Sequence, residues 1–236
     1  MKDSFKTKSK GLLGLFFLST TALASAQESK GCFNINADVV SSYVWRGINQ
    51  GSNQPNIQPT VSYTNGGFNI GTWGSGNFTG SLKEFDFYVT YAFPHFFSVT
   101  LTDYNWNFTK SHFIYNSNRT DHVFEGTLSY AGTEYFPLSA SLNTMFFGAD
   151  KNAEGDNAYS TYVELSYPIT SNAKLFLGTS LFDGPAYGTN GFGVTNLCIR
   201  ICKTIDFSDK FCLPVYGIAG FNPDAENAFL VAGITL

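Results

Sequence analysis

Side chains alternate in character along almost the whole chain after residue 30. The clearest runs cover 33–46, 84–91, 97–102, 138–144 and 159–167, where apolar or aromatic positions alternate with polar ones. Successive side chains of a β-strand point to opposite faces, so a period of two predicts strands. A helical period is absent after the first 26 residues. The pattern therefore predicts an all-β protein.

The alternating segments divide into twelve predicted strands. Their approximate spans are 33–48, 56–64, 67–77, 84–92, 96–108, 121–131, 136–147, 158–167, 174–183, 192–203, 211–221 and 227–236. Many approach the roughly 9–11 residues that a tilted strand needs to cross a bilayer. Ten or fourteen strands also fit the pattern, and an even number is expected when both termini lie on one side.

The composition favours a closed antiparallel transmembrane β-barrel over a soluble sheet. Aromatic residues make up 17% of the chain and charged residues only 14%, against about a quarter charged in an average soluble domain. A transmembrane barrel turns one strand face to lipid and the other to a polar lumen. The alternative is a secreted soluble β-sandwich, whose outer face would need more Lys and Glu than this chain carries.

The first 26 residues have the features of a secretory signal peptide. Four lysines precede the apolar stretch 11–23, and Ala24-Ser25-Ala26 supplies the small residues of a cleavage site. The stretch is shorter than the roughly 20 residues of a membrane anchor. Residues 27–236 would then form one barrel domain, exported to the bacterial outer membrane. This part carries a net charge of −7 and no basic run, which excludes nucleic acid as a partner.

Connections of two kinds alternate between the predicted strands. Short turns lie at 65–66, 94–95, 131–132 and 168–172, and longer polar connections at 49–55, 109–120, 148–157 and 184–191. Short periplasmic turns and longer outer loops are typical of outer-membrane barrels. Aromatic residues gather near the predicted strand ends, which predicts two girdles at the membrane interfaces. They are Tyr43, Trp45, Tyr63, Trp73, Tyr91, Phe93, Phe96, Trp106, Phe136, Phe146, Phe147 and Tyr167.

Residues 41–91 resemble the opening of a known family. The segment Ser42-Tyr43-Val44-Trp45-Arg46-Gly47-Ile48-Asn49-Gln50 is followed by Pro55-Asn56-Ile57-Gln58, then by Gly67 to Ser75 and Glu84 to Tyr88. This resembles the TorF-type porin family of bacterial outer-membrane proteins. Ser42, Trp45 and Pro59 depart from that family's usual Asp, Phe and Gly, and Leu236 stands where barrels usually end in an aromatic residue. The resemblance implies an outer-membrane barrel and a pore, and it names no substrate.

The predicted register places seven charged side chains on the inward face. They are Asp38, Arg46, Glu84, Asp86, Glu125, Glu164 and Arg200. Charge facing lipid is costly, about 2–4 kcal/mol for Arg near the midplane, so the lumen is the favoured location. Five acids against two arginines predict selectivity for cations or neutral polar solutes. Alternatively, Arg46 and Arg200 pair with those acids and plug the lumen.

Two functions follow from these alternatives. The first is that of a porin-like protein, which allows passive diffusion of small polar solutes or ions through a narrow lumen across the lipid bilayer. The second is that of a non-conducting structural or surface-binding barrel, whose loops at 109–120 and 148–157 meet partners at the cell surface. The sequence leaves the solute and the oligomeric state open.

Cysteine and histidine offer little chemistry beyond this. The hairpin turn expected at 204–210 would place Cys202 and Cys212 opposite each other, which predicts a disulfide in an oxidising compartment. Four free thiols are the alternative, and Cys32 with Cys198 is a weaker pairing. The sequence predicts no metal site and no cofactor, because no C-x-x-C occurs and no His lies near the cysteines. No nucleophile motif accompanies the three His residues, so we expect no enzyme activity.

Overall fold

A computed structural model of the chain describes residues 31–236 except 52, 107–112, 117–118 and 210. The predicted signal peptide therefore lies outside the described residues. The barrel strands are β1 (Cys32–Val40), β4 (Asn56–Asn65), β5 (Phe68–Asn77), β6 (Lys83–Ala92), β7 (Phe97–Asn105), β8 (His122–Tyr130), β9 (Ser139–Gly148), β10 (Thr161–Pro168), β11 (Ala173–Ser180), β12 (Gly193–Ser208), β13 (Phe211–Asn222) and β14 (Asn227–Thr235). Two short strands, β2 (Val44–Trp45) and β3 (Ile48–Asn49), form a separate sheet. In this part of the chain, no helix is long and apolar enough to cross a membrane.

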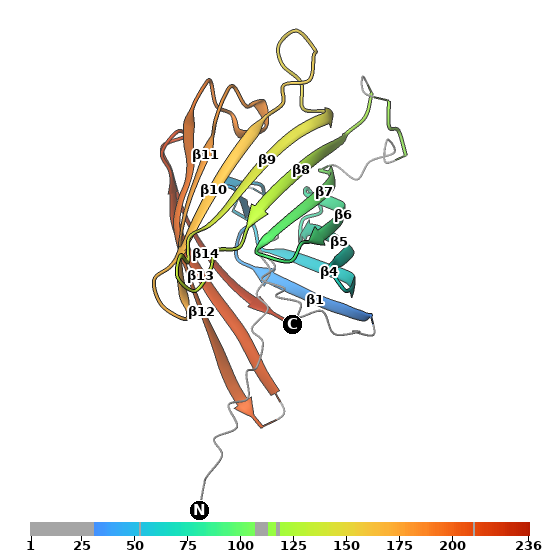
Figure 1. The fold of residues 1–236 in the computed structure, drawn as a ribbon. Helices are drawn as coiled ribbons and strands as arrows, with labels where there is room; N and C mark the ends of the chain where they lie inside the picture. Colours follow the sequence, from blue (N-terminus) through green and yellow to red (C-terminus); the bar gives the residue numbers. More distant parts are fainter. Residues whose placement is uncertain (1–30, 52, 107–112, 117–118, 210) are drawn as a thin grey trace, which may run out of the picture.

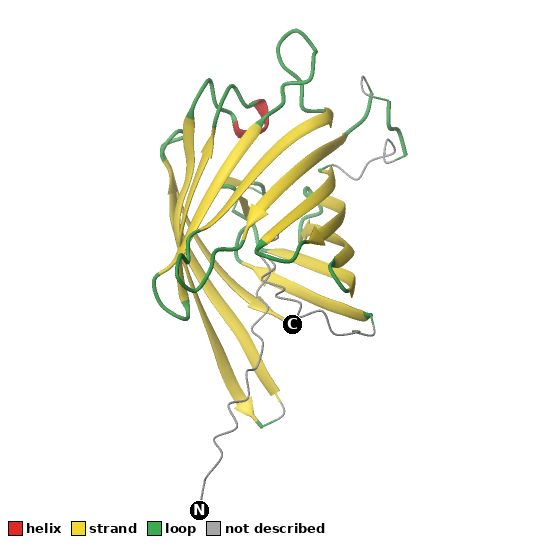
Figure 2. Ribbon diagram, in the orientation of Figure 1, coloured by secondary structure: helices red, strands yellow, loops and turns green. Residues whose placement is uncertain are grey.

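The twelve long strands close into one antiparallel barrel (Figures 1 and 2). This confirms the predicted fold class and strand number. Each strand pairs with its sequence neighbours, and β1 completes the ring by pairing with β14. That seam is short: Asp38–Val40 pair with Gly233–Thr235, and the backbones of Ala37 and Leu236 exchange two hydrogen bonds beside them, whereas all of β1 pairs with β4. The ring leaves the start of β1 and the end of β14 at the same end of the barrel, which we call the terminus end.

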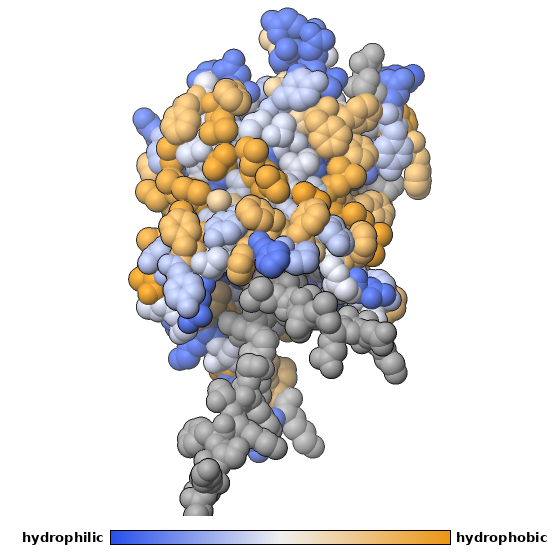
Figure 3. Space-filling model, in the orientation of Figure 1, coloured by the Kyte–Doolittle hydropathy of each residue, from blue (hydrophilic) through white to orange (hydrophobic). Residues whose placement is uncertain are grey.

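Polarity is inverted across the barrel wall. Along β4, the polar residues Asn56, Gln58 and Thr60 are buried, while Ile57 and Val61 are exposed. Apolar side chains cover much of the visible wall, and hydrophilic ones gather at the loops above it (Figure 3). A soluble sheet buries its apolar face, so the arrangement suits a wall that meets hydrocarbon outside and polar groups inside.

The first predicted strand, 33–48, is wrong beyond residue 40. Ser41 still donates its backbone N–H to the carbonyl of Ala232 on β14 (2.8 Å). The chain then leaves the wall, and residues 42–50 fold into the barrel as the β2–β3 hairpin. The alternation continues past residue 40 because this hairpin is also extended chain, so periodicity alone does not mark where the wall ends.

The predicted turn at 204–210 is also wrong, because β12 continues to Ser208 and β13 begins at Phe211. Residues 204–208 of β12 pair only with residues 211–214 of β13, and this end of the two strands projects beyond the other strands at the terminus end (Figure 1). In this longer hairpin Cys202 is opposite Tyr216, and Cys212 is opposite Asp206. The two cysteines are thus four residues apart along the ladder, about 13 Å at the usual rise. This exceeds the reach of a disulfide, and all four cysteines are free.

Candidate functional site

The β2–β3 hairpin carries the candidate site at its turn. Val44 pairs with Asn49 and Trp45 with Ile48, which leaves Arg46 and Gly47 as a two-residue loop. Both have positive φ, 50° and 81°, as a type I′ turn requires. Gly suits the second position, whereas Asn or Gly is favoured at the first. Arginine therefore occupies the first position at a conformational cost of order 1–3 kcal/mol.

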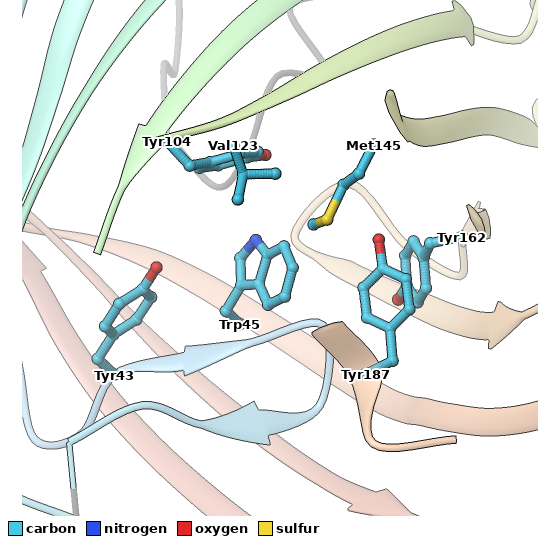
Figure 4. Close-up of a cluster of buried hydrophobic side chains, with 7 residues drawn as sticks. All are labelled: Tyr43, Trp45, Tyr104, Val123, Met145, Tyr162 and Tyr187. Atoms are coloured by element: carbon cyan, nitrogen blue, oxygen red, sulfur yellow. The ribbon is translucent and has the colours of Figure 1, made fainter. Parts of the chain in front are cut away.

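Aromatic side chains surround Trp45 inside the barrel. The buried cluster consists of Tyr43, Trp45, Tyr104, Val123, Met145, Tyr162 and Tyr187. Trp45 lies among the other six side chains (Figure 4). Its ring stacks on Tyr187 at 5.6 Å between centroids, and it meets Tyr104 edge-on at 6.0 Å. The cluster joins the hairpin to side chains from β7, β8, β9, β10 and the 185–187 turn, which fixes the hairpin in the lumen.

The guanidinium of Arg46 forms a two-pronged ion pair with Glu125 on β8. Its Nη1 donates to Oε2 (2.5 Å) and its Nη2 to Oε1 (2.8 Å). Nη1 also donates to the Tyr187 hydroxyl (2.6 Å), and the guanidinium carbon lies 4.7 Å from the centre of the Tyr162 ring. Such planar pairing and ring stacking are particular to arginine. The Glu125 residue is only 1% exposed, so each partner needs the other to offset its desolvation.

Wall residues hold Glu125 independently of the hairpin. The Tyr104 hydroxyl on β7 donates to its Oε1 (3.0 Å). The Thr127 hydroxyl on β8 is shared between the same oxygen (3.3 Å) and Asn143 Oδ1 (3.0 Å). Burial raises the pKa of the Tyr187 phenol well above its ordinary value, so this hydroxyl stays protonated beside the guanidinium. The carboxylate is therefore oriented by the wall itself, and Arg46 completes a set of contacts that the barrel already provides.

The hairpin touches the wall on opposite sides of the ring. Tyr43 packs on Trp73 of β5 (5.4 Å between centroids), while the Gly47 carbonyl accepts a hydrogen bond from Asn222 of β13 (3.3 Å). A Cβ built on Gly47 would lie 1.8 Å from the carbonyl oxygen of Thr195 on β12, so the backbones approach closely there. Together with Glu125 on β8, these contacts span the lumen. The hairpin therefore crosses the interior near the barrel's loop end, where the longer connections lie.

The other charged residues predicted to face inward lie in two groups, one on β1, β10 and β12 and the other on β6. On one side, Asp38 accepts hydrogen bonds from Tyr216 (3.0 Å) and Thr235 (2.6 Å). The guanidinium carbon of Arg200 lies over the same tyrosine ring, 4.1 Å from its centre. On β10, the half-buried Glu164 accepts from Tyr162 (3.0 Å).

Two buried carboxylates lie on β6 near the hairpin. Asp86 accepts a hydrogen bond from the Asn105 backbone at one oxygen (3.1 Å). Glu84 lies beside it and interacts with Tyr43, Asp86 and Trp106. Both carboxyl groups are thus part of a buried polar network next to the hairpin. Across the described residues, no group of three or more His, Cys, Asp or Glu is arranged to hold a metal ion.

Sequence reasoning missed the aromatic half of this site. Tyr43 and Trp45 were predicted for an interfacial girdle, yet they are 1% and 2% exposed inside the barrel. Trp73 and Trp106, also assigned to the girdle, pack against the same buried cluster. The residue pair Arg46-Gly47 was the available signal, because Gly after a strand marks a turn.

A separate polar pair lies on the outer side of the wall. Asp103 is opposite Phe87 and Phe124 in register, so it shares their outward face. Its Oδ1 lies 2.7 Å from His122 Nδ1, and the Tyr115 ring covers the histidine at 4.4 Å between centroids. The other ring nitrogen of His122 is also hydrogen-bonded, to Asn105 (3.1 Å). The hydrogen bond between Asp103 and His122, together with the Tyr115 ring over the histidine, shields these polar groups on the outer face of the wall.

The fold and its interior define a closed twelve-stranded antiparallel barrel with an apolar outer wall, a polar interior and an inserted hairpin. This class is compatible with an outer-membrane protein. The chain belongs to the Gcw_chp family, described as a bacterial protein of unknown function, whose family model matches residues 24–177. The matched range includes the hairpin. No curated protein matches the chain. The resemblance to TorF-type porins stays a prediction.

Proposed function

We propose that this protein is an outer-membrane barrel of the porin type. The β2–β3 hairpin closes its lumen, and the lumen opens when the hairpin detaches from the inner face of the barrel. The loop end would face the cell exterior and the terminus end the periplasm, as in other outer-membrane barrels. In the open state, small polar solutes or ions would diffuse passively through the lumen. The proposal assigns the barrel to transport and gives it no enzymatic step.

One observation carries the closed state: the hairpin makes side-chain contacts across the lumen. Trp45 and Arg46 are held by tyrosines from three different elements and by Glu125. The hairpin has only two residues in each strand, and an isolated two-stranded hairpin has little stability of its own. Its position therefore depends on these side chains, which is what a displaceable plug requires.

The charge of the lumen supports a preference for cations. Arg46 is neutralised by Glu125, while Glu84 and Asp86 on β6 add two further acidic side chains to the interior. Rings or walls of carboxylates favour cations in pores. Removal of the hairpin would also expose Glu125, which increases the negative charge facing the passage.

Recording in planar bilayers tests the closed state directly. In the test variant, residues 43–50 are replaced by Gly-Gly, which can bridge the gap because the Gln50 N–H donates to the Tyr43 carbonyl (2.9 Å). In the control variant, the projecting residues 204–214 are replaced by Asn-Gly. We expect rare current steps from the wild type and from the control, and frequent cation-selective steps from the test variant. Equal conductance in all three would overturn the plug.

A non-conducting surface barrel is the second candidate, and the span of hairpin contacts across the ring favours it. Under this alternative the hairpin is a permanent internal brace. The wild type would then give no current steps at all, whereas the first candidate expects rare ones. Fractionation of cells tests the membrane assignment separately, since recovery of the processed protein in the soluble periplasmic fraction would contradict both candidates.

A further inference from the structure

The geometry points to a guanidinium-binding site on the inner wall of the barrel, which the hairpin fills with its own Arg46. We propose that a guanidinium-bearing solute competes with Arg46 for this site. The inference rests on the proposed function, because such a solute would reach the site only through an open lumen. It extends that function by naming a chemical class of ligand.

Most contacts of the guanidinium come from outside the hairpin, although the hairpin's own Trp45 ring also lies 4.7 Å from it. Glu125 presents two carboxylate oxygens, and Tyr104 and Thr127 orient one of them by hydrogen bonds of 3.0 and 3.3 Å. Tyr162 offers a ring face 4.7 Å from the guanidinium carbon, and the Tyr187 hydroxyl accepts a hydrogen bond of 2.6 Å. The four residues other than Thr127 are nearly fully buried.

These groups select a guanidinium over other cations. Two parallel N–H donors match the two oxygens of Glu125, which a spherical or tetrahedral cation cannot do. A flat, weakly hydrated cation stacks on tyrosine faces better than a strongly hydrated ammonium does. Urea has the same planar shape and no charge, so it would leave the buried carboxylate unpaired.

Arginine occupies position 46 although the backbone conformation there disfavours a side chain of this kind. Residue 46 has φ 50°, where Asn or Gly would be favoured in a type I′ turn. Strained positions persist where surrounding contacts over-determine them, and they gather at ligand sites and switches. Arg46 thus acts as a tethered ligand for the wall. A free ligand of the same chemistry would release the hairpin.

Chemical rescue tests the site in the full-length processed protein, folded in lipid vesicles. The variant Arg46→Gly removes the tethered ligand and relaxes the turn, since Gly tolerates positive φ. We expect millimolar guanidinium chloride to raise the thermal unfolding midpoint of Arg46→Gly by several degrees, with calorimetric binding of one equivalent. Sodium chloride, methylammonium chloride and urea at the same concentrations should give no such shift. At these concentrations the wild type should be nearly unchanged, because its tethered Arg46 has a high effective concentration at the site and a free ligand displaces it only in excess.

The double variant Arg46→Gly/Glu125→Gln is the matched control and should lose the rescue. Three results would overturn the site. Guanidinium could leave the unfolding midpoint of Arg46→Gly unchanged, methylammonium could raise it equally, or the double variant could respond to guanidinium as strongly as the single variant. Should Arg46→Gly not fold, Arg46→Lys replaces it, because lysine keeps the charge and lacks the planar fork. These readouts do not require conductance. A barrel that binds guanidinium and passes no current would refute the proposed function and leave this site standing.

Discussion

Two hairpins in the described part of the chain leave the barrel wall, and they are held in opposite ways. The β12–β13 hairpin projects outward at the terminus end and continues the regular backbone ladder of two wall strands. The β2–β3 hairpin turns inward, has two residue pairs, and is fixed by side chains. The outward hairpin extends the sheet through backbone hydrogen bonds, whereas the inward hairpin is bound to the inner face of the barrel through its side chains.

Their exposed residues show the same contrast. Phe207 and Phe211 pack on each other at the projecting tip (5.5 Å between centroids) and stay 62% and 54% exposed. Trp45, at the inward tip, is 2% exposed. Burial and charge pairing are thus concentrated on the hairpin with the fewest backbone hydrogen bonds. Substitutions of side chains should therefore displace the inward hairpin and spare the outward one.

The largest expected effect follows from breaking the ion pair of the inward hairpin. Arg46→Gln leaves Glu125 buried without its partner, which costs about 3–5 kcal/mol. Urea unfolding in lipid vesicles should show this loss, and bilayer recordings should show frequent opening. The double variant Arg46→Gln/Glu125→Gln should be less destabilised than the single one, because it leaves no unpaired charge. A double variant that loses as much as both singles together would contradict the coupling.

The backbone approach at Gly47 gives the next largest effect. Gly47→Ala places a Cβ against the Thr195 carbonyl, 1.8 Å away, at φ 81°. We expect about 1–2 kcal/mol from the left-handed backbone and a further 1–3 kcal/mol, roughly, from the clash. Gly66→Ala is the matched control, because Gly66 also has positive φ and no atom lies within 4 Å of its added Cβ. If both variants lose the same stability, the hairpin does not press on β12.

A smaller effect is expected from the wall residue that orients Glu125. Thr127→Val removes one hydroxyl from the carboxylate, a loss of about 0.5–1.5 kcal/mol. Thr100→Val serves as the control, since Thr100 exchanges a hydrogen bond with Thr90 (2.8 Å) elsewhere in the lumen. Unfolding should detect both changes, while only Thr127→Val should raise the frequency of channel opening. Equal opening frequencies would remove Thr127 from the site.

The smallest effect belongs to the outward hairpin. Phe207→Ser and Phe211→Ser change exposed side chains, and each should alter the free energy of unfolding by less than about 0.5 kcal/mol. The plug should remain closed in both variants, as measured by conductance. A loss above about 1 kcal/mol in vesicles would show that the tip contacts lipid or protein, and the contrast between the two hairpins would then be weaker.

Most of the wall could be predicted from sequence, because a barrel strand alternates between two solvents. The turns at Asn65-Gly66 and near Pro94 follow from local chemistry, and the structure places strand ends beside them. The projecting hairpin was missed for a different reason. No Gly or Pro interrupts residues 203–208, so the sequence contains no turn signal there, and the strand predicted to end at 203 continues to 208.

The interior could be predicted only in part. The inward positions of Glu125 and Arg200 could be predicted, because a charged side chain is costly in contact with lipid. Tyr43 and Trp45 could not be sorted this way, because an aromatic ring suits both a membrane interface and a buried cluster. The ion pair between Arg46 and Glu125 joins residues 79 positions apart, and no local pattern reports such a distance.

The short seam between β1 and β14 has a consequence for biogenesis. Residues 38–40 meet 233–235 across nearly the full length of the chain, and pairings of such large sequence separation form slowly. Until then the sheet is an open curl with two unpaired edges, which are templates for association with other chains. We therefore expect the final residues to control the yield of folded protein more than its stability, and shielding of the unclosed sheet to matter most just before the ring is sealed.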